Sequence, residues 1–570
     1  MKLFFSTLLI FCFSISGFAK KTKVTTAAEI NNGFWFEGDT IVLQDGSWLN
    51  QSISIKANGS ASKPIVLMAE TPGNVILSGN SKLAFSGSHI VISGLYFKDG
   101  NLSGSDVISF RTSSSSLANN CRVTNCAIEN YNPAVNTVDS KWVSIYGENN
   151  QVDRCSFINK NNSGTLLVVW LKSGITPNHI IKDNYFGYRN ANLDGSGKEL
   201  NGQEIIRIGD SSTSMQTAGV QVTGNFFERC NGEIEIISNK SGGNLYSNNI
   251  FYECKGMLTL RHGNNCVVKG NYFFGNGVSS SGGVRIIGED HKVYNNYFEN
   301  LTGTNYRSAI CLVRGKENSA LNEYFQVKNA LVAFNTMVNC SQAFSVNYNS
   351  NSSYSMPPIG SVIAHNHVYN TSSSKTNVIV HSNFVDKMDV QWKNNLMNQG
   401  YITNLTFTAE QVVTNVDAKM NQAATIPKMY EPGPETGLLD FTTTEYPEID
   451  TDIRGRIRTG QKLPGASQLT GAVTQYIPQR DSVGATYYKI TTASKELKKK
   501  DKLRAYVSGN QLVVDVPVAG RLMVYDLNGR CVLTTRISAG ITRNTIPATG
   551  ILLVGVITDK GEKSFQKLFI

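Results

Sequence analysis

The sequence predicts an all-β protein: a right-handed parallel β-helix followed by a small C-terminal β-sandwich. The first observation is a recurring Asn–x–apolar pattern, with GLYF at Gly94 and CSFI at Cys155 filling two gaps. It occurs at Asn125, Asn184, Asn225, Asn249, Asn271, Asn296, Asn335, Asn366 and Asn395, mostly at intervals of 22 to 31 residues. The second is a series of short β-prone runs, such as VQVTGNFF and CVVKGNYFF, which glycine and asparagine interrupt at regular places. A repeat of this length with several short strands indicates a solenoid whose coils stack in register.

Within each coil, the recurrent asparagine is expected to stack at a turn, because asparagine tolerates left-handed backbone and its side chain caps main-chain groups. The apolar residue two positions later would then face the interior. Cys230, Cys254 and Cys340 each lie five residues after a repeat asparagine, and this shared phase predicts an interior stack of small side chains. The long intervals 184–225 and 296–335 must carry insertions, which often build the binding face of a solenoid.

The 570-residue chain begins with a segment typical of a secretory signal peptide, predicted over residues 1–19. Lys2 supplies the positive region, an apolar run follows, and cleavage is expected near Ala19. The β-helix domain is predicted over residues 20–475, because the segment DIRGRIRTGQKLPGASQ is of the kind that closes a secreted β-helix. Residues 476–504, which end in the charged run KELKKKDKLR, are predicted as a linker. No later stretch is long and apolar enough for a membrane-spanning helix.

Residues 505–570 are predicted to form the β-sandwich, with Asn528-Gly529 as a hairpin turn. The run VYDLNGRCV, the strand at 550–556 and the terminal KLFI resemble the C-terminal sorting domains of the type IX secretion system of Bacteroidota. That resemblance implies a partnership with the secretion machinery, and an ordinary accessory β-domain is the alternative. Together with the signal peptide, it implies a secreted, periplasmic or cell-surface protein of a Gram-negative bacterium.

The charge and cysteine content narrow the function classes. The formal net charge is +10, and a basic exported protein suits an acidic partner. Outside the cell this favours an acidic polysaccharide over nucleic acid, although the charge could serve solubility alone. After Cys12 leaves with the signal peptide, the remaining cysteines form no CxxC pair. We therefore expect neither a zinc site nor a disulfide framework.

The charged residues of the middle coils gather in four runs: NGQEIIRIG (201–209), NGEIEIISNK (231–240), GMLTLRHGN (256–264) and GGVRIIG (282–288). In a stacked solenoid, equivalent positions on neighbouring coils lie about 4.8 Å apart. Residues that are one repeat apart in sequence therefore become neighbours in space, and the four runs are expected to form one surface.

A metal site is predicted where Asn201, Glu204, Glu233 and Glu235 converge. Strand alternation points Glu233 and Glu235 the same way, and like charges so placed repel each other. Three carboxylates and an amide oxygen are hard donors, which is the ligand set of Ca²⁺ rather than of zinc or copper. The alternative is that Glu233 and Glu235 are solvated strand residues, and the presence of Glu204 one coil earlier favours the calcium site.

Lys240, Arg261 and Arg285 lie on successive coils and would form a trough for a polyanion. Arginine can clamp a sugar carboxylate with two parallel hydrogen bonds, and a lysine among other cations can act as a general base. Each residue alone could be a solvated surface charge. The combination favours β-elimination on a uronic acid polymer, in which a base removes the C5 proton and the oxygen at C4 leaves. Hydrolysis would need two acidic groups flanking the bond, and no Asp-Asp pair occurs.

As a set, the motifs NGxE, NGEIEIISNK, LRHG and GGVRIIG resemble polysaccharide lyase family 6, the calcium-dependent β-helix lyases that include alginate lyases and chondroitinase B. The resemblance covers about residues 22–475. It implies Lys240 as the Brønsted base and Arg261 as the acid or the group that stabilises the leaving oxygen. It also implies a Ca²⁺ site and three substrate-binding residues. The implied calcium ligands are Asn201, Glu204, Glu233 and Glu235, and the implied substrate-binding residues are Arg207, His262 and Arg285.

Three of these assignments need a further argument. Arginine is a poor proton donor because its pKa exceeds about 12, so we expect Arg261 to stabilise charge. Strand alternation puts Arg207 on the face opposite Glu204, so a bend must intervene between them. His262 alone could be a structural histidine.

Alginate is the expected substrate, because most members of the resembling family act on it. Dermatan-type chondroitin sulfate is the alternative, and recognition of sulfate should demand further basic residues near the cleft. A non-catalytic β-helix that binds acidic glycans is the rival from another class. It would keep the basic trough and would need neither Ca²⁺ nor Lys240.

Overall fold

The computed structural model describes residues 19–372, 376–403, 406–422, 429–458, 460–488, 504–508, 511–516, 518–526, 528–545, 551–559 and 563–569. The chain divides into two compact units, residues 1–489 and 490–570. The predicted signal peptide lies outside the described residues except for Ala19, and the charged run 495–504 does so except for Arg504. In the described part of the chain, no helix is long and apolar enough to cross a membrane.

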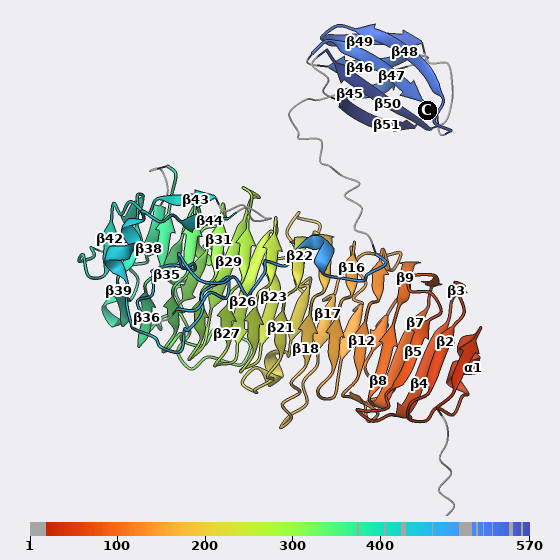
Figure 1. The fold of residues 1–570 in the computed structure, drawn as a ribbon, viewed down its shortest axis with the longest axis horizontal. Helices are drawn as coiled ribbons and strands as arrows, with labels where there is room; N and C mark the ends of the chain where they lie inside the picture. The colour runs from red at the N-terminus through yellow and green to blue at the C-terminus, as the bar shows by residue number, and fades with distance from the viewer. Residues whose placement is uncertain are drawn as a thin grey trace, which may run out of the picture. The chain divides into compact units, whose positions relative to one another are not determined.

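The first unit is a parallel β-helix, as the sequence predicts. Its described residues form three sheets of 14 strands, and each strand pairs in parallel with a strand of the next coil. Sheet A runs from β1 (Lys21–Val24) to β39 (Val390–Lys393), and sheet B runs from β3 (Gly46–Leu49) to β42 (Val412–Thr414). Figure 1 shows the coils advancing from the red end, where the helix α1 (Ala27–Asn31) lies, to the green and cyan coils.

Sheet C carries the candidate site. Alternate residues along its strands point into the core, and those between them face outward. In chain order the strands are β4 (Ser52–Asn58), β7 (Lys82–Ser88), β10 (Ile108–Ser109), β11 (Ala118–Asn119), β14 (Val143–Ile145), β17 (Leu167–Val169), β20 (Ile206–Ile208), β23 (Glu235–Lys240), β26 (Gly256–His262), β29 (Ser281–Ile286), β32 (Ile310–Val313), β35 (Phe344–Tyr348), β38 (Thr376–Val380) and β41 (Tyr401–Thr403).

A ladder of buried asparagines joins the coils at one corner. Each Nδ2 donates to the Oδ1 of the next rung at 2.9–3.0 Å. The rungs are Asn184, Asn225, Asn249, Asn271, Asn296, Asn335, Asn366 and Asn395.

The sequence placed the left-handed backbone at these asparagines, and the structure places it one residue earlier. Asn248, for example, has φ 58° and precedes the rung Asn249. The preceding residue makes the turn, which leaves the rung free to point inward and bond its neighbours. Asn125 also has a positive φ of 52°, so it is a turn residue and Cys126 holds the ladder position of that coil.

The apolar residue two positions after each rung faces the interior, as predicted. Phenylalanines at this position stack with ring centroids 4.5–4.9 Å apart, namely Phe186, Phe227, Phe251, Phe273 and Phe298. Cys230, Cys254 and Cys340 belong to the same buried core, which confirms their predicted interior position. Offset-stacked rings at this spacing add to the stabilisation that burial alone provides.

The packed β-helix unit extends past the predicted boundary at residue 475. Residues 477–488 lie along sheet B: the amide of Gly484 donates to the carbonyl of Asp183 at 2.8 Å, and Tyr487 Oη donates to the carbonyl of Leu95 at 2.8 Å. The division between the two units falls at residues 489 and 490, within the segment predicted as a linker.

The second unit consists of two antiparallel sheets, as the predicted β-sandwich requires. One sheet contains β45 (Arg504–Ser508), β46 (Gln511–Val516) and β49 (Gly540–Thr545); the other contains β47 (Gly520–Tyr525), β48 (Cys531–Ile537), β50 (Ile551–Thr558) and β51 (Lys563–Phe569). Leu512 from the first sheet and Leu522 and Val554 from the second share one buried core.

Candidate active site

Strands β20, β23, β26 and β29 are consecutive in sheet C and bring the four charged runs together. Arg207, Ser238, Thr259 and Arg285 occupy the same register position on these strands. Ile206 and Ile208 flank Arg207 and are buried in the core, so the row faces outward.

Lys240 and His262 end strands β23 and β26 and are register partners. The Lys240 ammonium makes no side-chain hydrogen bond within the described chain, although its charge acts on Glu233. Burial, followed by the positive charges of Arg261 and Lys240, lowers the pKa of His262 to about 3. The imidazole is therefore neutral at ordinary pH, and it can donate or accept a hydrogen bond beside the lysine.

The three glutamates come together, but not for the predicted reason. Glu204 and Glu235 hold equivalent positions on consecutive coils, because Ile206 pairs with Ile237 and each glutamate lies two residues earlier. Glu233 lies in a bend before β23, so strand alternation does not align it with Glu235. The bend nevertheless keeps Glu233 close to both carboxylates, whose charges act on its pKa.

Burial and the two neighbouring carboxylates change the pKa of Glu233. Its side chain is buried, and burial together with the negative charges of Glu204 and Glu235 raises its pKa to about 9. Glu204 Oε2 accepts a hydrogen bond from Thr165 Oγ1 at 2.6 Å. Like charges gathered in a buried place are costly unless something of opposite charge joins them.

The positive partners of Glu235 are Arg285 and Arg261. Arg285 Nη2 donates to Glu235 Oε1, and Arg261 Nε lies 3.9 Å from the same oxygen. The second oxygen, Oε2, accepts from Ser238 Oγ at 2.5 Å. Glu235 therefore links the carboxylate group to the arginines of the trough.

The chemistry of the donor set fits a hard divalent cation. Glu204, Glu233 and Glu235 are residues that are 3%, 8% and 9% exposed. They supply carboxylate oxygens, which are the ligands that Ca²⁺ prefers. Within the described residues, no cluster of three or more His, Cys, Asp or Glu side chains is arranged closely enough to hold a metal ion without movement. Asn201 is exposed at a bend in the insertion before β20, where no described hydrogen bond joins its side chain to the glutamates.

Arg189 belongs to this region, and sequence reasoning missed it. It is the penultimate residue of β19 (Tyr185–Asn190) in sheet B and is 1% exposed. Its Nη1 donates to the carbonyl of Glu204 at 2.9 Å, and its charge acts on Glu233. In sequence Arg189 looks like one more surface arginine, and only the insertion that carries Glu204 brings the two together.

Arg261 is held by the insertion between β32 and β33 (Leu331–Ala333). Its Nη2 donates to the carbonyl of Asn322 at 3.2 Å, and its guanidinium lies 4.2 Å from the ring centroid of Tyr324. This insertion is one of the two that the repeat spacing predicts, and it lies at the site. Tyr324 itself was not predicted, because nothing local marks its contact with Arg261.

Arg207 points outward because the chain bends before it. Residue Ile205 forms a bend between Glu204 and the start of β20, and both Ile205 and Ile206 are buried. The expected alternation is interrupted there, so Glu204 and Arg207 can serve one site. The Arg207 guanidinium lies 5.2 Å from the ring centroid of Trp170.

Several buried polar atoms of this surface lack a partner in the described chain: Arg207 Nε, Thr259 Oγ1, His262 Nδ1 and Arg285 Nε. Buried polar groups in native proteins are almost always hydrogen-bonded. Orphaned donors and acceptors in the row over β20 to β29 are what a polar ligand laid across these strands would satisfy.

Known proteins share this architecture. The chondroitinase B family model matches residues 25–436. The PL6 family alginate lyase AlyGC is 33% identical with a TM-score of 0.71, and the match covers 82% of this chain and 59% of that one. This chain thus spans less than two thirds of the length of AlyGC. No curated protein sequence matches the chain.

Two further structures agree. A mannuronic acid specific family 6 lyase from human gut microbiota is 28% identical, with a TM-score of 0.62, over 69% of this chain and 90% of that one. A PL6 lyase from Pseudopedobacter saltans is 27% identical, with a TM-score of 0.57, over 69% of this chain and 98% of that one. The chain therefore belongs to the polysaccharide lyase family that contains chondroitinase B and the PL6 alginate lyases.

Proposed function

We propose that the protein is a polysaccharide lyase that cleaves alginate by β-elimination and leaves an unsaturated uronate at the new non-reducing end. The observation that carries the proposal is the outward row of unsatisfied arginine, threonine and histidine atoms beside Lys240. A polyanion with carboxylates and hydroxyls suits that row. Alginate is favoured because AlyGC and the mannuronic acid specific lyase have this fold and are 33% and 28% identical.

Lys240 is the proposed base. It ends β23 beside the neutral imidazole of His262 and makes no side-chain hydrogen bond to a described residue. In the proposed step its amine takes the C5 proton of the uronate, and the C4 oxygen leaves with its electron pair. His262 and Arg285 orient the sugar carboxylate.

Arg261 stabilises the negative charge that develops during the step. A guanidinium group is a cation with several hydrogen-bond donors, and Tyr324 and the carbonyl of Asn322 hold that of Arg261 in place. A donor that is already oriented costs no reorganisation when charge appears. The proton for the leaving oxygen then comes from water.

Glu204, Glu233 and Glu235 are the proposed calcium ligands, with Asn201 added by movement of its insertion. Bound there, Ca²⁺ would neutralise the substrate carboxylate and make the C5 proton more acidic. Arg285 and Ser238, which now contact Glu235, keep that carboxylate aimed at the same surface.

The test is the absorbance near 235 nm that a conjugated double bond produces, followed with polymannuronate, polyguluronate, mixed alginate and dermatan sulfate in the presence of calcium. A rise on an alginate that is lost in Lys240→Ala supports the proposal. A rise on dermatan sulfate alone would assign the chondroitinase activity that the family model also represents. No rise on any polymer means a non-catalytic glycan binder, and a rise unaffected by Lys240→Ala contradicts the mechanism.

We also propose that the protein is exported, by the leader ending near Ala19, and that residues 505–570 act as a type IX sorting domain. The support is the leader sequence and the VYDLNGRCV motif. N-terminal sequencing of the protein from the culture medium of its host should begin near Lys20. A protein that retains Met1 inside the cell contradicts the proposal.

A further inference from the structure

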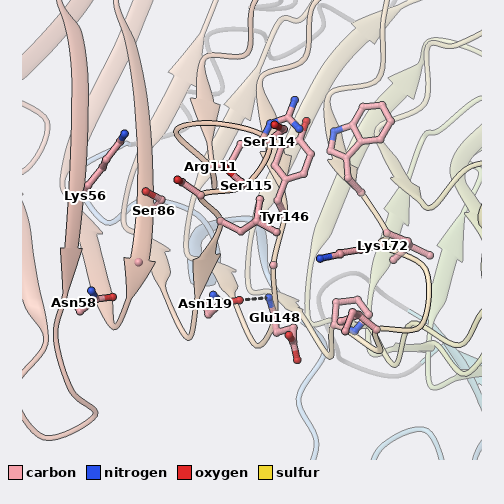
Figure 2. Close-up of a pocket in the computed structure, with 18 of the residues that line it drawn as sticks. Lys56, Asn58, Ser86, Arg111, Ser114, Ser115, Asn119, Tyr146, Glu148 and Lys172 are labelled. Atoms are coloured by element: carbon pink, nitrogen blue, oxygen red, sulfur yellow. Dashed lines mark hydrogen bonds between the residues drawn. The ribbon is translucent and has the colours of Figure 1, made fainter.

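A cavity of about 790 Å³ opens at the C-terminal ends of the sheet C strands, where Lys240 also lies, but several coils earlier in the solenoid. The ends of β4 and β7 and the residues that directly follow β14 and β17 line it. Figure 2 shows Lys56 on one side, Lys172 on the other, and Arg111 and Tyr146 between them. None of these residues is part of the site described above.

An unbroken row of rings and guanidinium groups leads from this cavity to the active site. The Arg111 guanidinium lies 3.9 Å from the ring centroid of Tyr146. The Tyr146 and Trp170 rings are stacked, with centroids 6.1 Å apart and planes 8° apart. The Arg207 guanidinium lies 5.2 Å from the ring centroid of Trp170. The Trp170 Nε1 donates to Ser144 Oγ at 3.2 Å. That hydrogen bond holds the indole in place.

The cavity is positively charged. Lys56, Arg111 and Lys172 line it, and no ion pair joins any of them to a described carboxylate. The acidic side chain among the lining residues is Glu148, whose backbone amide donates to Asn119 Oδ1 at 3.0 Å. Three cations against one carboxylate, with half-buried aromatic faces between them, are a surface for an anionic and partly apolar ligand.

The cavity lies close to the active site. Leu171 lines the cavity, and a Cβ built on Gly209 would lie 3.0 Å from its Cδ1 and 2.6 Å from the carbonyl oxygen of Lys240. Gly209, which follows β20, therefore lies between the lining of the cavity and the end of β23 that carries Lys240. From β10 to β23 there are four strand spacings, or about 19 Å at ~4.8 Å each.

We propose that this cavity is a distal subsite that binds a uronate segment of the same polysaccharide chain, several sugars away from the bond that is cleaved. Identifying the ligand as a uronan depends on the function proposed above. Pyranose rings pack their C–H groups against the exposed edges of Tyr146 and Trp170, and the uronate carboxylates meet Arg111, Lys172 and Lys56. The subsite gives the protein a preference for long substrates.

The test compares substrates of different length. In Arg111→Gln and Tyr146→Ala, kcat/KM on an alginate octasaccharide should fall about tenfold, since a contact of this kind supplies one to two kcal/mol. A trisaccharide places at most two sugars on this side of the cleaved bond and so does not reach Tyr146 or Arg111, and on it kcat/KM should change less than twofold. Lys269→Gln is the matched control, because Lys269 is an exposed cation on β27 (Val267–Lys269) of sheet A. Equal losses on both substrates, or no loss on the octasaccharide, overturn the subsite.

Binding without turnover separates this inference from the proposed function. In a Lys240→Ala background, the Kd for the octasaccharide should rise about tenfold when Arg111→Gln is added, and tryptophan fluorescence should respond to the ligand unless Trp170 is replaced by Phe. If the wild-type protein cleaves no uronan but this binding pattern holds, the lyase proposal fails and the subsite remains. If it cleaves alginate and binding ignores Arg111, the subsite fails alone.

Discussion

Arg261 shows how much of the active site depends on contacts made away from the substrate. A guanidinium on a strand end could adopt many rotamers, and the insertion over β26 restricts it through Tyr324 and a backbone carbonyl. The restriction matters because stabilising a developing charge requires a donor that is already in position. Tyr324 is in this sense a positioning residue.

Replacing Tyr324 should therefore lower kcat without removing any proposed catalytic group. We expect Tyr324→Ala to lose about 3- to 30-fold in kcat, the range that a cation–π contact supplies. Tyr324→Phe keeps the ring and should retain near wild-type kcat. The double variant Arg261→Ala/Tyr324→Ala should be no worse than Arg261→Ala alone, and additive losses would show that Tyr324 acts independently of Arg261.

Glu233 allows a test of the calcium site that does not depend on activity. Near pH 7 the raised pKa of Glu233 means that its carboxyl must take up a proton on folding, and Glu233→Gln removes that cost, so the variant without metal should melt at a higher temperature than the wild type. Added Ca²⁺ at about 100 times its Kd should stabilise the wild type by about 2.7 kcal/mol and the variant much less. Thermal melts with calcium and with chelator measure both, and an equal calcium shift in the two proteins contradicts the site.

The sequence predicted which residues gather at the site better than it predicted how. Stacking by one repeat brings the four charged runs onto neighbouring strands, and that follows from periodicity alone. Glu233 reaches Glu235 through a bend, which no alternation rule describes. Arg189 reaches the glutamates through the length of an insertion. Contacts made by insertions depend on loop conformation, which the repeat spacing does not predict.

At the scale of elements, the asparagine ladder holds one corner of the solenoid. Asn249 Oδ1 accepts from the amide and the Nδ2 of Asn225, and its own Nδ2 donates to Val222 and Asn271. Removing a rung leaves several buried backbone and side-chain groups without partners, and each such group costs about 1–3 kcal/mol. The ladder should thus contribute more to stability than its side chains' size suggests.

We expect Asn249→Ala to lower the free energy of unfolding by about 2–5 kcal/mol, measured by denaturant titration. Asn248→Gly is the matched control, because Asn248 has φ 58° and glycine adopts that backbone freely. The control should change stability by less than about 1 kcal/mol. If both substitutions cost the same, the ladder hydrogen bonds are not what stabilises this corner.

In one coil, the repeat pattern predicted the ladder position one residue too early. Asn125 matches the motif, yet it makes the turn and Cys126 takes the rung. Sequence alone could not decide between them, since asparagine suits both a left-handed turn and a buried rung.

At the scale of the whole molecule, buried histidines tie stability to pH. Burial alone lowers the pKa of His367 to about 4, against about 6.5 in an unfolded chain. Above pH 6.5 the imidazole of His367 is neutral in both the folded and the unfolded state. As pH falls from 6.5 towards 4, the unfolded state binds a proton that the folded state does not, so the free energy of unfolding decreases.

Between pH 7 and pH 5, His367 should therefore contribute a loss of about 2 kcal/mol. Denaturant titrations at the two pH values should show a smaller decrease for His367→Gln than for the wild type. His89, for comparison, lies in a turn with positive φ and is partly exposed, so His89→Asn should keep the wild-type difference. Identical decreases in the wild type and His367→Gln would contradict the argument.

The two units have separate cores, one in the β-helix and one in the residues of the β-sandwich. Every residue of the proposed active site and of the distal subsite lies in the first unit. A protein that ends at residue 489 should keep the full kcat/KM on alginate and the melting temperature of the β-helix. A tenfold loss of kcat/KM would show that the second unit takes part in catalysis.

One property of the solenoid has a consequence for how such proteins diverge. The distance along the axis between the distal subsite and Lys240 is a whole number of coils, because both lie at the same edge of sheet C. Gain or loss of a coil between β10 and β23 would change that distance by one strand spacing, about 4.8 Å, without altering either site. The minimum length of the preferred oligosaccharide should therefore change in discrete steps during evolution, one step for each coil gained or lost.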